Sequence, residues 1–343
     1  MNESAIKEKI NKNLFSTING KDLMEMNLPP LQYTINTILP HGFFLLAGGA
    51  KVGISWLAEQ ISYAVASGDE LWGYPATQSE VLYLALEDTV TRLQNRFEML
   101  DAYAGMENIH FALQANNITS GVEDDIRDYL SKYPKIKLII IDTVQHIRGN
   151  EYVKNIYAGD VEFTNILRKI SIEFDLTILA LTHTNKGKHD DDISKISGSE
   201  GMAGGTDGNW VMTKNKRTDT RAYLTISNRD TESFEFTLEF DKDSCRWIKL
   251  THDKSIANEK ELFLHTIVNF IKAENSHHWE GTATELLTLL QTKETTFINY
   301  SASVFSRNLK SSQDILRNIY GVSYTNTFHN KKRWITLNYI EIK

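Results

Sequence analysis

The chain has 343 residues, of which 41% are hydrophobic and 24% are charged, and its formal net charge is −7. This composition is typical of a globular protein with room for one large and one small domain, and the acidic balance argues against a uniformly basic surface that coats nucleic acid. No apolar run approaches the ~18 residues of a membrane span, and the polar start MNESAIKEKINKNLF lacks the apolar segment of a secretory signal. With Cys245 as its one cysteine, the chain is expected to be cytoplasmic, without membrane contact, intrachain disulfide or cysteine-based zinc site.

The first 40 residues read as a lead-in segment, with a short helix expected at KDLMEM and an extended turn at Pro29 and Pro30. Apolar strand-like runs then alternate with amphipathic helical segments. The strands are expected at 42–48, 80–87, 109–113, 136–142 and 176–183, and the helices at 55–68, 89–105, 121–134 and 158–175. Continuous β-branched runs between helices predict a parallel sheet that is covered on both faces.

The pattern changes after residue 185. A polar, glycine-rich stretch over 186–208 is long enough to predict a functional loop, and three segments with period-two alternation predict antiparallel strands at the sheet edge. Those strands are expected at 209–215, 221–229 and 233–241.

The last 90 or so residues carry a third pattern. Helices are expected at 259–274, 282–291 and 301–321, followed by a hairpin over 322–342 with a basic turn. Thr282 and Glu285 form a capping box at the start of the second helix. Three helices and a hairpin predict a winged helix. The fold class is therefore α/β, with a lead-in over 1–40, a P-loop domain with a mainly parallel sheet over 41–252, and a small α+β winged-helix domain over 253–343.

A degenerate phosphate-binding loop lies between the first strand and the first helix of the P-loop domain. Gly48, Gly53 and Ser55 fit the pattern G-x-x-x-x-G-K-[ST], but Ile54 stands where the pattern has Lys. The loop amides and the helix N-terminus favour phosphate and the Ser55 hydroxyl suits Mg²⁺, whereas Ile54 supplies no charge. Lys51, inside the loop, is a cation that could reach phosphate from another angle. The residues assigned to nucleotide binding are Gly48, Gly49, Ala50, Lys51, Val52, Gly53, Ile54, Ser55 and Trp56.

Carboxylates follow two of the predicted strands. Asp142 ends the buried run KLIIID, the arrangement of a Walker B strand, and would hold Mg²⁺ together with Ser55. Glu87 and Asp88 end another strand, where a carboxylate can polarise the attacking water. The alternative is that these two acids only cap the following helix.

The motifs LLAGGAKVGISWLA, VLYLALEDTVTRLQNRF, KLIIIDTVQHIR and ILALTHTNKG occur in the order and spacing of the RecA-like hexameric ATPases. Over roughly residues 20–250 the chain most resembles the branch that includes plasmid RepA-type replicative helicases and related ATPases of phages and mobile elements. The resemblance implies ATP and Mg²⁺ as cofactors, a homo-oligomer that is expected to be a hexamer, and a role in DNA replication. The chain departs from that family at Ile54, where the family has Lys and most sites lose hydrolysis without it.

The resemblance also implies roles for individual residues. Glu87 corresponds to the catalytic base, and His183 or Thr184 to the residue that senses the γ-phosphate. Arg229 corresponds to a basic residue that reaches the nucleotide of the neighbouring subunit. Two lysines, Lys214 and Lys216, are alternatives to Arg229 for that role.

DNA is the implied partner. The segment SGSEGMAGGTD matches a loop that faces the central channel in related helicases, so single-stranded DNA is expected along 186–208, and the C-terminal segment is similar to winged-helix tails that would meet duplex DNA. The expected DNA contacts are Lys186, Lys188, Lys195, Arg307, Lys310, Arg317, Lys331, Lys332 and Arg333. A second hypothesis is a catalytically silent protein that binds DNA or assembles through its winged helix. A dinucleotide-binding enzyme is set aside because no G-x-G-x-x-G follows the first strand.

Overall fold

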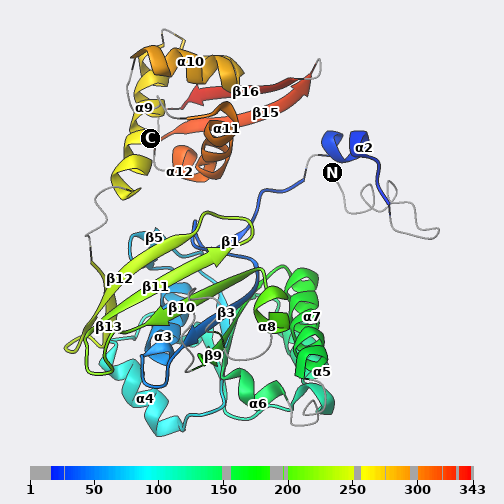
Figure 1. The fold of residues 1–343 in the computed structure, drawn as a ribbon, viewed down its shortest axis with the longest axis vertical. Coiled ribbons are helices and arrows are strands. Elements are labelled where there is room, and N and C mark those ends of the chain that lie inside the picture. Colours follow the sequence, from blue (N-terminus) through cyan, green and yellow to red (C-terminus); the bar gives the residue numbers. More distant parts are fainter. Residues whose placement is uncertain are drawn as a thin grey trace. The chain divides into compact units, whose positions relative to one another are not determined.

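The computed structural model describes residues 17–26, 28–148, 156–185, 196, 200–250, 256–274, 276–293, 300–318, 320–329 and 332–340. The chain divides into two compact units (Figure 1). The larger unit is Leu31–His252, and the smaller unit is Asp253–Lys343 together with Met1–Pro30. Each unit is described by itself.

A nine-stranded sheet runs through the larger unit in the order β13-β12-β11-β10-β3-β9-β8-β6-β7. Its strands are β3 (Gly42–Gly48), β6 (Glu80–Ala85), β7 (Ile109–Ala112), β8 (Ile136–Asp142), β9 (Thr177–His183), β10 (Gly208–Thr213), β11 (Arg221–Asn228), β12 (Phe234–Asp241) and β13 (Arg246–Lys249). The six strands from β7 to β10 pair in parallel, and β11 to β13 continue the sheet in antiparallel fashion. The mainly parallel sheet confirms the predicted fold class.

Two details of the edge differ from the prediction. β10 was expected to be one of three antiparallel strands at the sheet edge, but it pairs in parallel with β3 and in antiparallel fashion with β11. It is therefore the strand at which the sheet changes direction, a position that a period-two pattern does not reveal. The short strand β13 was not expected.

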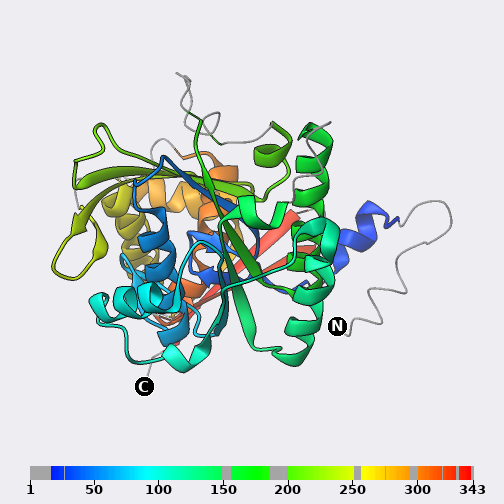
Figure 2. The same ribbon diagram turned by 90° about the horizontal axis from the view of Figure 1, so that it is seen from below.

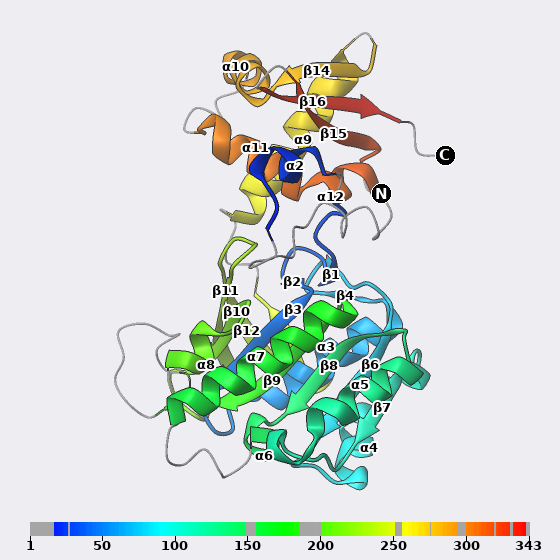
Figure 3. The same ribbon diagram turned by 90° about the vertical axis from the view of Figure 1, so that its right-hand side faces the viewer.

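Helices cover both faces of this sheet, as predicted (Figures 2 and 3). On one face lie α3 (Ile54–Ser67) and α4 (Val90–Met99), whose buried side chains share a core with those of β6 and β8 such as Tyr83 and Ile140. On the other face lie α5 (Val122–Lys132), α6 (Val144–Arg148) and α7 (Ile156–Phe174). The sheet is thus an inner layer, and each strand end meets a helix or loop. Shorter elements complete the unit: β1 (Tyr33–Ile35), β2 (Leu39–Pro40), β4 (Glu70–Leu71), β5 (Tyr74–Pro75), α8 (Glu200–Gly204) and the 3₁₀ turns η1 (Met106–Asn108) and η2 (Ile118–Ser120).

Backbone conformation explains where the helices begin and end. Helix α3 begins after Gly53 (φ 106°) and ends at Gly68 (φ 79°), two left-handed positions that glycine adopts without strain. Helix α4 ends at Met99 rather than at the expected Gly105, because Asp101 turns into the left-handed region (φ 51°).

The smaller unit contains helices around a three-stranded antiparallel sheet of order β14-β16-β15. Its elements are α2 (Gly20–Glu25), α9 (Ile256–Ala273), β14 (His278–Thr282), α10 (Ala283–Lys293), α11 (Ala302–Ser311), α12 (Gln313–Asn318), β15 (Val322–His329) and β16 (Lys332–Tyr339). The expected hairpin over 322–342 is confirmed as β15 and β16. The long third helix was wrong: it is interrupted at Ser312, whose N–H bonds back to Asn308 and Lys310 before α12 starts.

The predicted capping box is also confirmed. The backbone N–H of Thr282 donates to Glu285 Oε2 (2.7 Å), and the N–H of Glu285 donates to Thr282 Oγ1 (3.3 Å). Buried side chains of α9, α10 and α11, among them Phe263, Leu286 and Phe305, form the core of this unit with β15 and β16. Among all the described residues, no helix has the length and apolar character that a bilayer span requires.

Candidate nucleotide site

The phosphate-binding loop leaves the carboxyl end of β3, between the neighbouring strands β9 and β10. Its first and last glycines have no room for a side chain. A Cβ on Gly48 would lie 2.6 Å from Cγ2 of Ile54, and a Cβ on Gly53 would lie 2.8 Å from Cζ2 of Trp247. Lys51 lies in the loop with a left-handed backbone (φ 67°) and an exposed side chain. The loop therefore has the tight backbone path that a nest of N–H groups requires.

Ile54 is a core residue. Its side chain is 7% exposed, contacts the backbone of Gly48, and belongs to the apolar cluster that includes Leu57 and Ile61 of α3. The position that carries an ammonium group in an ordinary phosphate-binding loop is filled here by packed methyl groups.

Ser55 and Asp142, the two predicted Mg²⁺ ligands, meet in the structure. Asp142 is 4% exposed and accepts hydrogen bonds from the Ser55 hydroxyl and from the Tyr83 hydroxyl (3.3 Å). Burial raises the pKa of Asp142 to about 6; the Ser55 and Tyr83 hydrogen bonds oppose this shift, and the charges of Asp88 and Glu87 add to it. A buried carboxylate beside a hydroxyl is a set of hard oxygen donors, which fits Mg²⁺ bound to nucleotide phosphates.

Glu87 lies in the turn after β6, beside the end of β8. The N–H of Leu86 donates to the carbonyl of Asp142 (2.8 Å), which ties the two strand ends together. The Glu87 carboxylate accepts a hydrogen bond from Thr143 Oγ1 (2.8 Å) and lies 3.4 Å from Nε2 of His146. The sequence reasoning missed Thr143 and His146, although both directly follow the Walker B strand. With its side chain 46% exposed, Glu87 is held in place yet open to water.

Thr89, and not Glu87 or Asp88, is the N-cap of α4, and the two acids come directly before it. Asp88 instead pairs with two arginines of that helix, Arg92 (2.8 Å) and Arg96 (3.1 Å). Its side chain is 6% exposed.

Arg96 also pairs with Glu59 (2.7 Å), which lies on α3 one turn after Ser55 and is fully buried. Burial raises the pKa of Glu59 to about 7, against the opposing charge and hydrogen bond of Arg96. The sequence reasoning missed this group as well. The available signal was an acid four residues after Ser55 within a mostly apolar helix.

The end of β9 adds polar groups on the other side of the loop. His183 pairs in register with Gly48 and is exposed, and the N–H of Thr184 donates to the carbonyl of Gly48 (3.2 Å). Gln145, after the Walker B strand, donates to Thr182 Oγ1 (3.4 Å). The predicted sensor residues therefore lie next to the loop.

These features agree with comparisons to known proteins. Residues 15–189, half of the chain, match the model of a family described as AAA domain. The chain belongs to the AAA domain family. No curated protein matches it.

Two solved structures resemble the AAA-domain chain at low sequence identity. The ATPase domain of G40P superposes with a TM-score of 0.50 at 14% identity, over 61% of this chain and 85% of that one. A KaiC-like protein from the archaeon Pyrococcus horikoshii OT3 gives a TM-score of 0.46 at 15% identity, over 64% of this chain and all of that one. The first likeness, together with the parallel sheet, shows a RecA-like P-loop NTPase fold.

Arg229 lies far from the loop of its own chain. It follows β11, where its backbone N–H donates to the carbonyl of Asp207. The N–H of Asp207 in turn donates to the carbonyl of Phe43, at the beginning of β3. The loop leaves the other end of β3, about five residues or ~16 Å away. Its guanidinium donates to the carbonyl of Gly204 (2.8 Å). Contact with a neighbouring subunit's nucleotide stays a prediction.

The alternatives to Arg229 lie at the other end of the sheet. Lys214 and Lys216 follow β10, whose Met212 pairs with Gly48 at the loop.

The predicted DNA-binding residues fall into two groups. Arg307, Lys310, Arg317, Lys332 and Arg333 are exposed on α11, α12 and β16 of the smaller unit. Lys186, Lys188, Lys195 and Lys331 lie outside the described residues.

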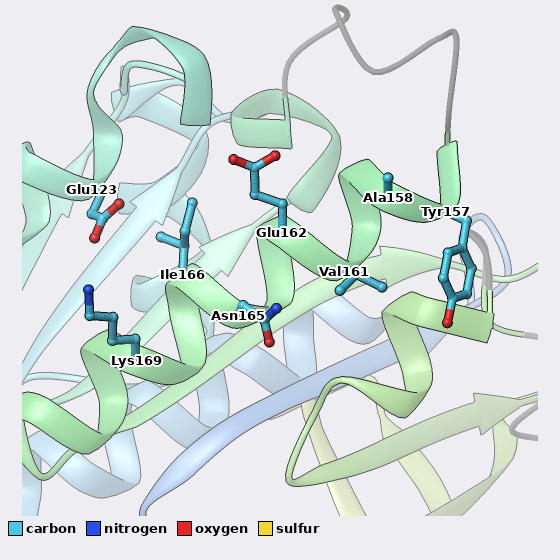
Figure 4. A pocket seen from close by; sticks show the side chains of 8 residues that line it. All are labelled: Glu123, Tyr157, Ala158, Val161, Glu162, Asn165, Ile166 and Lys169. Atoms are coloured by element: carbon cyan, nitrogen blue, oxygen red, sulfur yellow. The ribbon is translucent and has the colours of Figure 1, made fainter. Parts of the chain in front are cut away.

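A cavity of about 630 Å³ lies along α7, where Tyr157, Val161, Ile166 and Lys169 line it together with Glu123 of α5 (Figure 4). Helix α7 covers the sheet face opposite α3, so this cavity is separate from the loop.

Proposed function

We propose that this chain is a RecA-like ATPase that binds ATP and Mg²⁺ at the loop after β3 and acts, as a ring, in the replication of a plasmid, phage or mobile element. The observation that carries the proposal is the Ser55 hydroxyl beside the buried Asp142 carboxylate at the loop, next to the water-accessible Glu87. Burial disfavours the charged form of the Asp142 carboxylate, and a cation bound between Asp142 and Ser55 would offset that cost.

Each residue has a role in this proposal. The amides of the loop and of the first turn of α3 would hold the phosphates, and Ser55 and Asp142 would hold Mg²⁺, which neutralises phosphate charge when bound. Glu87 would accept a proton from the attacking water, with Thr143 fixing its orientation. His183 and Thr184, which lie beside Gly48, would sense the γ-phosphate, and Arg229 would serve a neighbouring subunit.

Ile54 limits this chemistry to slow turnover. Loop amides contribute much of the binding of phosphate, whereas the missing ammonium would act on charge that develops in the transition state. Loss of one such group costs ~10²–10³ in rate. The chain is therefore expected to bind ATP and to hydrolyse it weakly.

The test compares the chain as written with Ile54→Lys. Calorimetry with Mg²⁺-ATP should give a measurable affinity for both proteins, and phosphate release should rise by ~10²-fold in Ile54→Lys. Ile54→Met is the control, since it changes the side chain without adding charge. Absence of ATP binding by both the chain and Ile54→Lys would refute the proposal.

The second candidate is a catalytically silent protein that binds DNA or assembles through the smaller unit. The observation that favours it is Ile54, a packed core residue at the position of the catalytic ammonium, together with exposed basic side chains on α11 and β16. Here DNA binding would be indifferent to ATP. Exchange of Arg307, Lys310, Lys332 and Arg333 for Gln should then weaken duplex binding and lower its salt dependence, as a loss of phosphate contacts does. If DNA affinity depended on ATP, the ATPase proposal would be supported over the catalytically silent protein.

A further inference from the structure

An ordinary phosphate-binding loop adds a cation to its backbone amides, and Ile54 supplies none. Lys51 lies in the loop, but its side chain is exposed and projects from a left-handed residue. A second lysine, Lys214, reaches the loop region from the neighbouring strand. The inference that follows rests on the proposed nucleotide site.

Trp247 of β13 forms a fixed wall behind the last residue of the loop. Its indole Nε1 donates to the carbonyl of Gly53 (3.1 Å), and its ring leaves no space for a Cβ at that glycine. The backbone of Trp247 exchanges two hydrogen bonds with the side chain of Gln60 on α3 (2.9 and 3.1 Å), and its carbonyl accepts a third from Trp72 (2.7 Å). Trp247 is 1% exposed, and the hydrogen bonds of its indole Nε1 and of its backbone hold the ring against the loop.

Lys214 is directed to this wall. Side chains two residues apart in a strand share a face. Trp210 and Met212 of β10 are buried on the face that carries α3, and Met212 pairs with Gly48. Lys214 continues that alternation just beyond the strand, and its Nζ lies 5.0 Å from the centre of the Trp247 ring.

The ammonium group is partly withdrawn from water. Lys214 is half-buried, and burial lowers its pKa, while the charge of Asp219 opposes that shift. A cation over an aromatic face is held by a modest attraction. It is therefore positioned next to the loop and remains able to exchange the ring for a phosphate oxygen.

We propose that Lys214 supplies, from the strand beside the loop and within the same chain, the phosphate-binding charge that is absent at Ile54. It binds the β- and γ-phosphates as a point charge, in place of the lysine that would follow Gly53. This role differs from contact with a neighbouring subunit's nucleotide, because Lys214 belongs to the chain whose loop it serves.

The test measures the affinity of the full chain for ATP, ADP and AMP, each with Mg²⁺, by calorimetry. Lys214→Met keeps an unbranched side chain over Trp247 and should weaken ATP binding about tenfold, ADP binding less and AMP binding hardly at all. Lys214→Arg should stay within about threefold of the unaltered chain. Lys249→Met is the matched control, because Lys249 also covers aromatic rings, those of Tyr74 and Phe236, and should leave all three affinities unchanged.

The Ile54→Lys background separates this role from a structural one. If Lys214 replaces the missing lysine, Lys214→Met should lose less than about threefold in ATP affinity once Ile54→Lys is present. An equal loss in both backgrounds, an equal loss for ATP and AMP, or no loss in the chain as written would overturn the inference while leaving the nucleotide site standing. Absence of ATP binding in every protein, Ile54→Lys included, would overturn both.

Discussion

The two sides of the candidate site are built differently. On the loop side, shape comes from the backbone: two glycines without room for a Cβ, a left-handed Lys51, and Ile54 packed inward. On the acidic side, shape comes from charged side chains, since the buried carboxylates of Asp88 and Glu59 both pair with Arg96. The loop side therefore depends on space and backbone conformation, whereas the acidic side depends on its buried partners.

Removal of a buried partner should give the largest effect. Arg96→Met leaves Glu59 and Asp88 without the guanidinium that joins them, and the unfolding free energy should fall by about 3 kcal/mol, as for other buried pairs that lose one partner. Chemical denaturation measures it.

Arg92→Met is the control for that experiment. Arg92 pairs with the same Asp88, but its side chain is 53% exposed, so its loss should cost well under 1 kcal/mol. Equal losses of unfolding free energy for the two variants would mean that burial of an ion pair does not set how much it stabilises the acidic side.

The loop side should respond to added volume. Gly53→Ala places a Cβ 2.8 Å from the Trp247 ring at a φ of 106°, and steric overlap with backbone strain should cost about 2 kcal/mol. Gly73→Ala has a similar backbone (φ 84°) but nothing within 4 Å of the new Cβ, so it should show the strain alone, about 1 kcal/mol. Denaturation curves for the two alanine variants give the difference, and equal losses would contradict a packed loop.

The contrast between the two sides also explains what the sequence could predict. The loop, Ser55, Asp142 and Glu87 follow from local pattern, because glycines and strand-end acids occupy fixed places around a parallel sheet. The role of Trp247 and the Glu59–Arg96 pair depend on segments far apart in the chain, and no local period places them together. Strand direction at β10 and the interruption at Ser312 were wrong for the same reason: periodicity gives the type of an element but neither its partner nor a single non-helical residue within it.

The unfolding free energy should depend on pH between 6 and 8 because of buried carboxylates on the acidic side. Between its ordinary pKa of 4.5 and its folded pKa of about 7, Glu59 binds more proton in the folded chain than in the unfolded chain, so stability falls as pH rises through 7. From pH 6 to pH 8 this one group should cost about 1.4 kcal/mol, and Asp142, with a pKa of about 6, adds a smaller loss.

Glu59→Gln keeps an acceptor for Arg96 and removes the titration, so it should flatten the stability profile between pH 6 and pH 8. Unfolding free energies at several pH values measure this. An unchanged slope in the variant would show that Glu59 is not the titrating group.

The smallest effect should come from the cap that starts the helix behind Glu87. Thr89 accepts a hydrogen bond from the N–H of Arg92 (3.3 Å), and Thr89→Ala should lower the unfolding free energy by about 0.5–1 kcal/mol. Thr89→Ser retains the acceptor and should restore most of that loss.

Because the cap stands two residues after Glu87, fraying there should loosen the turn that presents Glu87, while the loop on the other side stays ordered. Amide hydrogen exchange can resolve this: faster exchange in the first turn of α4 with no change in the first turn of α3 is expected, and equal acceleration in both turns would show that the two sides are one cooperative unit.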